Sequence, residues 1–139
     1  MVYIRMILLW QQKLMDWLFN PGGLMNWYLA VLKKYAVFKG RARRKEYWMF
    51  FLFNLIIAFV LGMVEGFLGI NPTGGQSILA DIYQLAVLLP SIAVGIRRMH
   101  DVNKSGWFIL VPIYNLFLAV KQGDVGENRF GPDPLEVVS

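Results

Sequence analysis

The chain has 139 residues, of which 57% are hydrophobic and 17% are charged. A soluble domain typically has about 45–50% apolar and about 25% charged residues, so the additional apolar side chains must contact lipid, a partner or one another. The net charge is +5, and most basic residues flank apolar runs, which favours membrane lipids with anionic headgroups over nucleic acid as the partner. The absence of cysteine excludes disulfide bonds, thiolate zinc sites and cysteine nucleophiles.

Residues 1–24 form an N-terminal extension that is only weakly amphipathic. Arg5, Gln12 and Asp16 share one narrow polar stripe of a helix over residues 2–19. No small-residue cleavage site follows the apolar run, so we expect the segment to be retained, or to lie upstream of a true start at Met25. The sequence Asn-Pro-Gly-Gly at residues 20–23 predicts a break before the next helix.

Residues 25–39 predict an amphipathic helix at the membrane interface. Asn26, Lys33 and Lys34 lie on one side of this helix, and aromatic and aliphatic side chains share a broad arc on the other. We expect the arc to lie at the acyl boundary and the lysines to face the headgroups. The arc comprises Trp27, Tyr28, Leu29, Val31, Leu32, Tyr35 and Phe38.

Three apolar runs follow. Residues 47–70 and 78–96 are about 24 and about 19 residues long, which is enough to cross a hydrocarbon core about 30 Å thick. Residues 107–120 would rise only about 21 Å as a helix and contain Pro112, so this run either spans with help from its flanks or enters the membrane and returns. We therefore expect an all-α membrane protein with an N-terminal interfacial amphipathic helix, two long transmembrane helices and a third short transmembrane or re-entrant segment. The membrane domain would cover residues 25–134, with a C-terminal tail at 135–139.

The distribution of basic residues predicts the orientation. Lysine and arginine are dense over residues 33–45 and recur after the second run at Arg97, Arg98 and Lys104, whereas residues 71–77 carry no charge. By the positive-inside rule, the N-terminus and the 97–106 loop are expected in the cytoplasm and the 71–77 turn outside. The side of the C-terminus depends on whether residues 107–120 span fully.

An antiparallel hairpin would bring residues 40–48 and 97–101 to one cytoplasmic surface. Five arginines would then crowd together, and guanidinium groups repel one another unless an anion lies between them. This Arg-rich collar is predicted to bind anionic lipid headgroups, another phosphate-bearing ligand or a partner protein. The alternative is ordinary juxtamembrane charge, stabilised by local pairs with Glu46 and Asp101. The candidate contact residues are Arg41, Arg43, Arg44, Arg97, Arg98, His100 and Asp101.

A stripe of small and polar residues lies on the first apolar run. Asn54, Ala58, Gly62 and Gly66 are spaced four apart and so share one helix face. The two glycines form a GxxxG motif, which lets a second helix approach closely. The stripe therefore predicts helix packing, either within the chain or in a homo-oligomer.

Other polar groups lie within the apolar runs. Pro90 leaves the carbonyl four residues earlier without its helical donor, and Asn54 is a candidate to supply one, although a kink is the expected use of the proline. Glu65 and Asp81 lie near the outer ends of their runs, where we expect both to be ionised in the wet interface. If these acids, Asn54 and Gln84 instead lined a path, the chain would be a subunit of an oligomeric transporter or channel.

His100 and Asp101 are the remaining candidates for catalysis. Adjacent residues rarely orient one another as a catalytic triad requires, and no nucleophile motif accompanies them. One histidine and no cysteine argue against a transition-metal site, and no phosphate-binding glycine loop is present, so we expect no metal and no cofactor. We predict a non-enzymatic protein, and an enzyme acting on a lipid phosphate with His100 as general base is the least favoured alternative.

A family resemblance rests on three blocks in fixed order: FKGRARRKEYWMF (residues 38–50), LPSIAVGIRRMHDVNKSGWF (89–108) and GDVGENRFGPDP (123–134). Together they resemble the domain-of-unknown-function family 805, which consists of small bacterial inner-membrane proteins of the YhaH type. The resemblance covers roughly residues 25–134 and implies a multi-pass protein of the bacterial inner membrane, without an established activity. In the third block, Asp133 can reach Arg97 and Arg98 only if the tail is cytoplasmic. The alternative is an extended chain end held by nothing.

Overall fold

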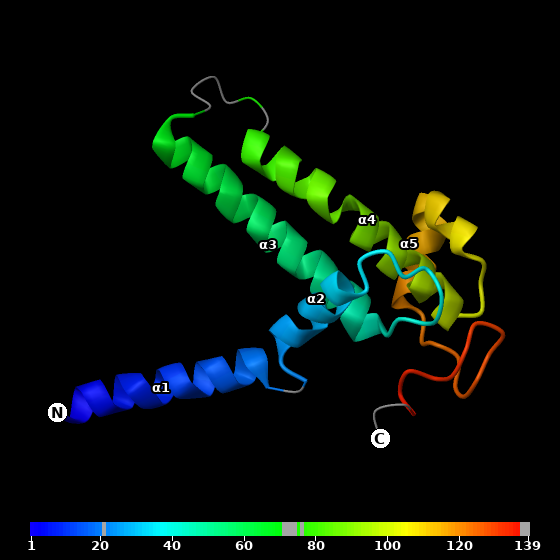
Figure 1. Ribbon diagram of the computed structural model, residues 1–139, viewed down its shortest axis with the longest axis horizontal. Helices are drawn as coiled ribbons and strands as arrows, with labels where there is room; N and C mark the ends of the chain where they lie inside the picture. The colour runs from blue at the N-terminus through cyan, green and yellow to red at the C-terminus, as the bar shows by residue number, and fades with distance from the viewer. Residues whose placement is uncertain (21, 71–74, 76, 137–139) are drawn as a thin grey trace.

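The computed structural model describes residues 1–20, 22–70, 75 and 77–136, and its regular elements are helical (Figure 1). The prediction of an all-α chain is therefore confirmed. The elements are α1 (Val2–Phe19), α2 (Leu24–Lys33), α3 (Arg44–Leu68), α4 (Ile78–Asp101), the 3-10 turn η1 (Gly106–Leu110) and α5 (Pro112–Val120).

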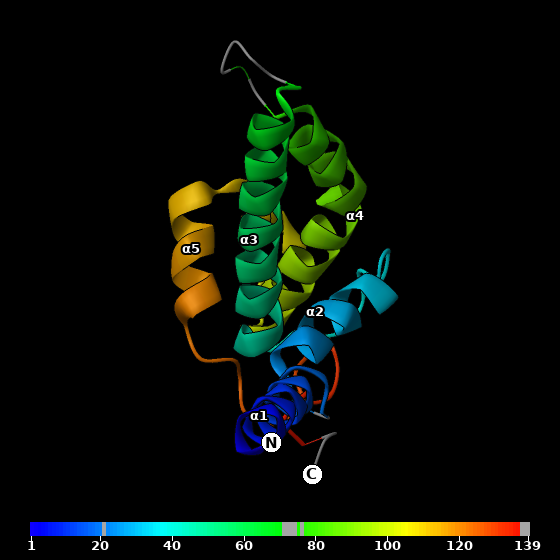
Figure 2. The same cartoon turned by 90° about the vertical axis from the view of Figure 1, so that its left-hand side faces the viewer.

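An antiparallel hairpin of α3 and α4 dominates the molecule (Figures 1 and 2). Both helices are long and apolar enough to cross a membrane. They contain 25 and 24 residues, so each extends about 36 Å along its axis. The two predicted spans are thus present as helices. The predicted outer turn at residues 71–77 lies largely outside the described residues, which include only Gly75 and Ser77 of it.

Both helices continue past the apolar runs at the arginine-rich end of the hairpin. α3 begins at Arg44, and α4 continues to Asp101 instead of ending before Arg97. A charged residue usually marks the point where a helix leaves the apolar region. Here Arg97 and Arg98 are 1% and 0% exposed, because they pack inside the protein. At the opposite end, α3 stops at Gly69, whose φ of 64° is the left-handed conformation typical of a helix C-cap.

The amphipathic segment after residue 24 is a short helix packed on the hairpin. α2 ends at Lys33, and its Tyr28 and Val31 are buried in a cluster with residues of α3 and α4. The Tyr28 ring stacks on Phe50 with a centroid distance of 5.3 Å, and its hydroxyl lies 2.8 Å from that of Tyr83. Part of the predicted aromatic arc is therefore covered by protein instead of acyl chains. The helical periodicity of the apolar residues is the same for packing on protein and for contact with lipid, so the sequence does not separate the two.

Pro112 divides the third apolar run. It is the first residue of α5, which has nine residues and a length of about 14 Å, too short to cross a bilayer. α5 lies beside α3, and the chain then returns to the end of the hairpin that holds Arg44 (Figure 2). The Arg44 guanidinium lies 3.4 Å from the Val120 carbonyl, and the Trp48 indole donates to the Ala119 carbonyl at 3.2 Å. The run is thus a short helix that leads back to the arginine-rich end of the hairpin, and its entry into the membrane stays a prediction.

Pro90 lies inside α4 without ending it. The carbonyl of Ala86, which loses its helical donor, accepts a hydrogen bond from the Tyr35 hydroxyl at 2.9 Å. The suggestion that Asn54 supplies this bond is wrong. Its amide donates within α3, and its carbonyl accepts from the Tyr83 hydroxyl at 2.6 Å.

α1 extends away from the hairpin at the arginine-rich end, where it contacts α2 (Figure 1). None of its residues is buried. The N-terminal extension is therefore helical, as its polar stripe suggested, and it adds nothing to the core of the hairpin.

Candidate functional site

The five candidate arginines gather at one end of the hairpin. Two lie in the segment before α3, one opens α3 and two lie in the last turns of α4. The N–H of Ala42 donates to the Arg97 carbonyl at 3.0 Å, which joins the two basic segments through their backbones. In chain order the arginines are Arg41, Arg43, Arg44, Arg97 and Arg98.

Two carboxylates form ion pairs with three of these arginines. Arg41 Nε lies 3.0 Å from one oxygen of Asp101, and the Arg98 guanidinium donates to the other. Arg97 Nη1 lies 2.6 Å from Glu46 Oε1. Each of the three arginine side chains is at most 1% exposed, and buried charges at this depth are tolerated only when paired. The local Arg–Glu and Arg–Asp pairs that the sequence offered as an alternative are therefore present.

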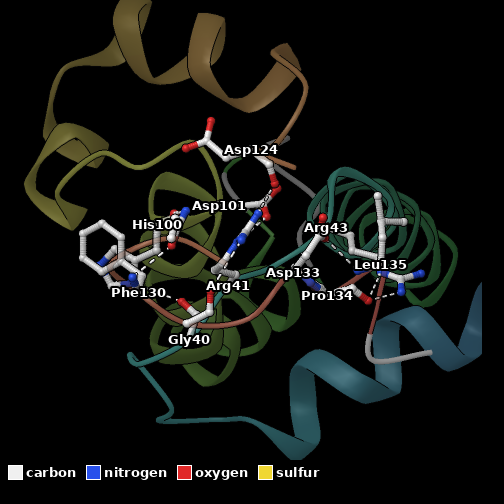
Figure 3. Close-up of polar contacts among 12 residues, drawn as sticks. Gly40, Arg41, Arg43, His100, Asp101, Asp124, Phe130, Asp133, Pro134 and Leu135 are labelled. Atoms are coloured by element: carbon white, nitrogen blue, oxygen red, sulfur yellow. Dashed lines mark hydrogen bonds and ion pairs between the residues drawn. The ribbon is translucent and has the colours of Figure 1, made fainter. Parts of the chain in front are cut away.

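The guanidinium groups also bind the end of α5 and the segment that follows it, residues 121–136. From here on, this longer segment is called the tail, in place of the predicted tail at 135–139. Arg98 donates to carbonyls in the last turn of α5, where helical acceptors lack partners. Arg41 and Arg43 donate to carbonyls of the tail (Figure 3). A planar fork with five N–H groups suits several fixed acceptors at once, so these arginines fasten an irregular segment to the hairpin. The acceptors are Leu118, Ala119 and Lys121 for Arg98, Asp124 and Gly126 for Arg41, and Pro134 for Arg43.

Asp133 organises the tail from within. Its side chain is 4% exposed and accepts hydrogen bonds from the N–H groups of Leu135 at 2.8 Å and Gly126 at 3.0 Å. The bond from Leu135 is the main cause that lowers the pKa of Asp133 below its ordinary value of 3.8, against the opposing effect of burial. The Gly126 bond and the positive charges of Arg41 and Arg43 lower the pKa further. The arginines whose charge acts on Asp133 are thus Arg41 and Arg43 in place of the expected Arg97 and Arg98, and no ion pair joins Asp133 to them among the described residues.

His100 has a structural environment. Its Nδ1–H donates to the Gly40 carbonyl at 3.1 Å, which requires the proton on that nitrogen (Figure 3). Its ring stacks on Phe130 at a centroid distance of 3.9 Å, and the Arg129 guanidinium lies 4.7 Å above the same Phe130 ring. Asp101, its neighbour in sequence, contacts arginines instead. The two residues therefore do not form a catalytic pair.

Arg44 and Lys45 differ from the buried arginines because both are exposed. They line a cavity of about 210 Å³ together with Arg43, Trp27 and residues of the tail. The Arg43 guanidinium lies 5.7 Å from the centre of the Trp27 ring, a cation–π distance. The exposed part of the collar is therefore at the start of α3.

The acidic counter-groups Glu46 and Asp101 were predictable from the sequence, but the tail as a binding partner of the arginines was not. The need for glycine at position 123 is visible only in the structure, where a Cβ atom would clash with the Asp101 carboxylate that Arg41 and Arg98 hold in place. The next N–H, that of Asp124, donates to the Asp101 carbonyl at 2.8 Å.

The predicted packing stripe on α3 is mostly open within this chain. Among the described residues, no atom beyond the adjoining helix backbone lies within 4 Å of a Cβ built at Gly62 or Gly66, and Ala58 is half-buried. Asn54 is the member that contacts α4, through Tyr83. The GxxxG motif is therefore not used for close helix packing among the described residues.

Comparison with known proteins connects this arrangement to a family. The family described as "Protein of unknown function (DUF805)" matches residues 35–132, which include every arginine of the cluster and most of the tail. The chain belongs to the DUF805 family. The DUF805 resemblance inferred from the three sequence blocks is thus confirmed.

The DUF805 relatives with curated names are bacterial. The inner membrane protein YhaH of Escherichia coli (strain K12) is 50% identical over 117 residues, covering 79% of this chain and 97% of that protein. The inner membrane protein YhaI of the same strain is 44% identical over 117 residues, covering 79% of this chain and 96% of that protein. No solved structure matches the chain. With its two long apolar helices, this DUF805 chain is an all-helical membrane protein whose relatives are inner membrane proteins.

Proposed function

We propose that this chain is a non-enzymatic protein of the bacterial inner membrane whose exposed basic rim binds anionic lipid headgroups on the cytoplasmic side. The rim consists of Arg44, Lys45 and Lys121, which are exposed at the end of the hairpin. The contact between Arg44 and the Val120 carbonyl places the first and last of these side by side. That juxtaposition of exposed positive charge at a helix end is the main support for the proposal.

The charge distribution supports the cytoplasmic orientation in this proposal. The arginine-rich end gathers basic residues of the α2–α3 segment, the end of α4 and the tail, and such clusters remain on the cytoplasmic side. Lysine and arginine next to a span each gain about 1 kcal/mol from an anionic lipid surface. Trp27 and Trp48 lie at the same end, where indole rings favour the headgroup region.

The structure restricts which members of the original collar can contact lipid. Arg41, Arg97 and Arg98 are buried and bonded to protein groups, so their part in the proposal is to hold the end of the hairpin together. Replacing Arg97 and Arg98 would therefore test folding. The matching test of lipid binding is a change of Arg44 and Lys45.

The test compares lipid selectivity of the wild type with the R44Q/K45Q variant. Both are reconstituted in phosphatidylcholine vesicles that contain about 20–30% phosphatidylglycerol, an anionic fraction on the order of that in a cell membrane. Spin-labelled lipids then report which headgroup is retained at the protein. We expect the preference for phosphatidylglycerol to fall about five- to tenfold in low salt, and the difference to shrink in high salt as screening increases.

Lys104→Gln is the matched control, because it removes one positive charge from the α4–η1 loop without touching the rim. An unchanged preference in R44Q/K45Q would overturn the proposal. An equal loss in Lys104→Gln would show that net charge, and not the rim, sets the selectivity.

The oligomeric transporter or channel is the second candidate, and the geometry favours it less. Of its four proposed lining residues, Asn54 is bonded to Tyr83, and Glu65 is buried with one oxygen accepting from the N–H of Leu79 at 2.5 Å. Asn54 and one oxygen of Glu65 are thereby occupied in joining α3 to α4. Solute or ion flux in proteoliposomes that Glu65→Gln abolishes would reverse this ranking.

A further inference from the structure

The outward side of α4 presents a continuous stripe of uncovered side chains. Asp81, Gln84, Leu88 and Ile92 follow one another at intervals of three or four residues and therefore share one face of the helix, and Leu85 lies beside Gln84 at the edge of that face. All five are exposed. Three are apolar, as expected for a helix that contacts lipid, but Asp81 and Gln84 are not.

A groove of about 590 Å³ lies along this stripe, between α3 and α4. Gln84, Leu85 and Leu88 line it from α4, and Phe51 and Asn54 line it from α3. The two helices therefore leave between them a concave surface into which the side chains of another helix fit.

Gln84 is a polar group on this surface whose side chain makes no hydrogen bond with the described residues. It lies six residues inside α4, about 9 Å along the axis from Ile78, and so within the hydrocarbon region if the helix spans. Its amide has two donors and one acceptor, and no described residue bonds to it. Lipid chains offer no partner, and an amide without one is costly in hydrocarbon.

We propose that two copies of the chain associate in the membrane along this stripe, with each Gln84 amide hydrogen-bonded to Gln84 of the second copy. A two-fold axis makes the contact self-complementary, because the same amide supplies both the donor and the acceptor. Leu85 and Leu88 of one copy then pack against the groove of the other. The proposal is independent of the headgroup proposal, since the stripe and the basic rim are separate surfaces.

A second copy fits this surface better than an acyl chain does. An acyl chain fills the groove but leaves the Gln84 amide unpaired, whereas a facing glutamine satisfies it. Asp81 does not oppose the contact, because it lies in the first turn of α4 at the membrane surface, where both carboxylates remain hydrated.

The absence of cysteine allows a direct test by crosslinking in the membrane. Leu85→Cys places a thiol on the stripe, and Phe59→Cys provides a matched control on α3. The two side chains are 72% and 68% exposed. α3 and α4 are antiparallel, and the contacts of Glu65 with Leu79 and of Glu46 with Arg97 fix their register. In this register, positions 59 and 85 lie at similar depth along the hairpin. Phe59 does not line the groove. On mild oxidation of membranes, we expect at least about five times more disulfide-linked dimer from Leu85→Cys than from Phe59→Cys.

A second measurement isolates the amide. Energy transfer between donor- and acceptor-labelled copies, followed as protein is diluted in phosphatidylcholine vesicles, gives the association constant. We expect Gln84→Leu to weaken association about three- to thirtyfold, the range of one or two hydrogen bonds between membrane helices. Gln12→Leu on α1 is the control for loss of an exposed amide, and it should leave the constant unchanged.

Each contrary result would overturn the proposal. A monomeric wild type that retains a lipid through purification would mean that an acyl chain occupies the groove. Equal crosslinking of the two cysteine variants would mean that collisions are random. If Gly62→Ile weakened association by this amount and Gln84→Leu left the association constant unchanged, the contact would belong to the glycine stripe on α3 instead.

Discussion

Asp101 is the acceptor that holds two buried guanidinium groups in place. Its two oxygens pair with Arg41 and Arg98, and its backbone carbonyl accepts from Asp124 of the tail. Removing the negative charge would leave two buried positive charges with only carbonyl partners. Breaking a buried pair in this way typically costs about 3–5 kcal/mol, much more than a surface charge is worth.

We therefore predict that Asp101→Asn strongly destabilises the protein. Its unfolding in mild detergent, followed by thermal or denaturant titration, should show a loss of about 3–5 kcal/mol. Asp124→Asn is the control, because the side chain of Asp124 is only half-buried and makes no ion pair among the described residues. It should change the stability by less than about 0.5 kcal/mol. Equal stability of the two variants would show that Asp101 is not the centre of the cluster.

The hydrogen bond at Pro90 shows where single-residue prediction from the sequence stops. The chemistry of proline alone predicts that the Ala86 carbonyl loses its helical donor. The donor that replaces it, Tyr35, lies 51 positions earlier and reaches α4 only because α2 packs across the hairpin. Nothing in the local sequence indicates that crossing, and the prediction that Asn54 donates to the Ala86 carbonyl was therefore wrong.

At the scale of elements, length and apolarity were sufficient to find the two long helices, because a bilayer imposes a minimum span. The end of α4 was harder. Arg97 and Arg98 resemble the residues that end a span, and only their ion pairs with Glu46 and Asp101 reveal that the helix continues. The tail was the least predictable element. It has no periodicity, and its conformation depends on carbonyls that bind side chains from another part of the chain.

The tail also provides a prediction about pH. Because the pKa of Asp133 is lower in the folded protein than its ordinary 3.8, the carboxylate form stabilises the docked tail. This contribution is complete above pH 3.8 and is lost as the pH falls through the lowered value. We therefore expect the tail to stay docked at neutral pH and to detach in strong acid, while α3 and α4 remain helical.

A spin label at Val125→Cys can follow the detachment, because this side chain is exposed while its neighbours bond to the arginines. The label should be immobilised at pH 7 and become mobile below pH 3.8. In the Asp133→Asn background it should already be more mobile at pH 7 and should lose the acid transition. If Asp133→Asn keeps both the neutral immobilisation and the transition, another group holds the tail.

At the scale of the whole molecule, the two ends of the hairpin have different tasks. The end near Gly69 and Ser77 has few charges, and Glu65 joins α3 to the start of α4 there. The opposite end concentrates the ion pairs, the tail and the exposed basic rim. Such a difference in charge between the two ends is typical of a membrane protein whose basic end faces the cytoplasm.

The side on which the tail lies is the decisive prediction for this arrangement. The carbonyls of Gly126 and Pro134 bond to Arg41 and Arg43 just before α3, so Leu135 and Lys45 must lie on the same side of the membrane. Gly75, between α3 and α4, must lie on the other. Because the chain has no cysteine, Lys45→Cys, Leu135→Cys and Gly75→Cys each introduce a unique thiol.

With a maleimide that cannot cross membranes, we expect intact spheroplasts to label Gly75→Cys alone, and permeabilised ones to label all three. The experiment separates the fold from its orientation. Labelling of Lys45→Cys and Leu135→Cys together from outside, with Gly75→Cys protected, would invert the orientation but keep the fold and its arginine–tail bonds. Labelling of Leu135→Cys from outside while Lys45→Cys stays protected would contradict the fold itself. The carbonyls of the tail would then lie across a bilayer from the arginines that bind them.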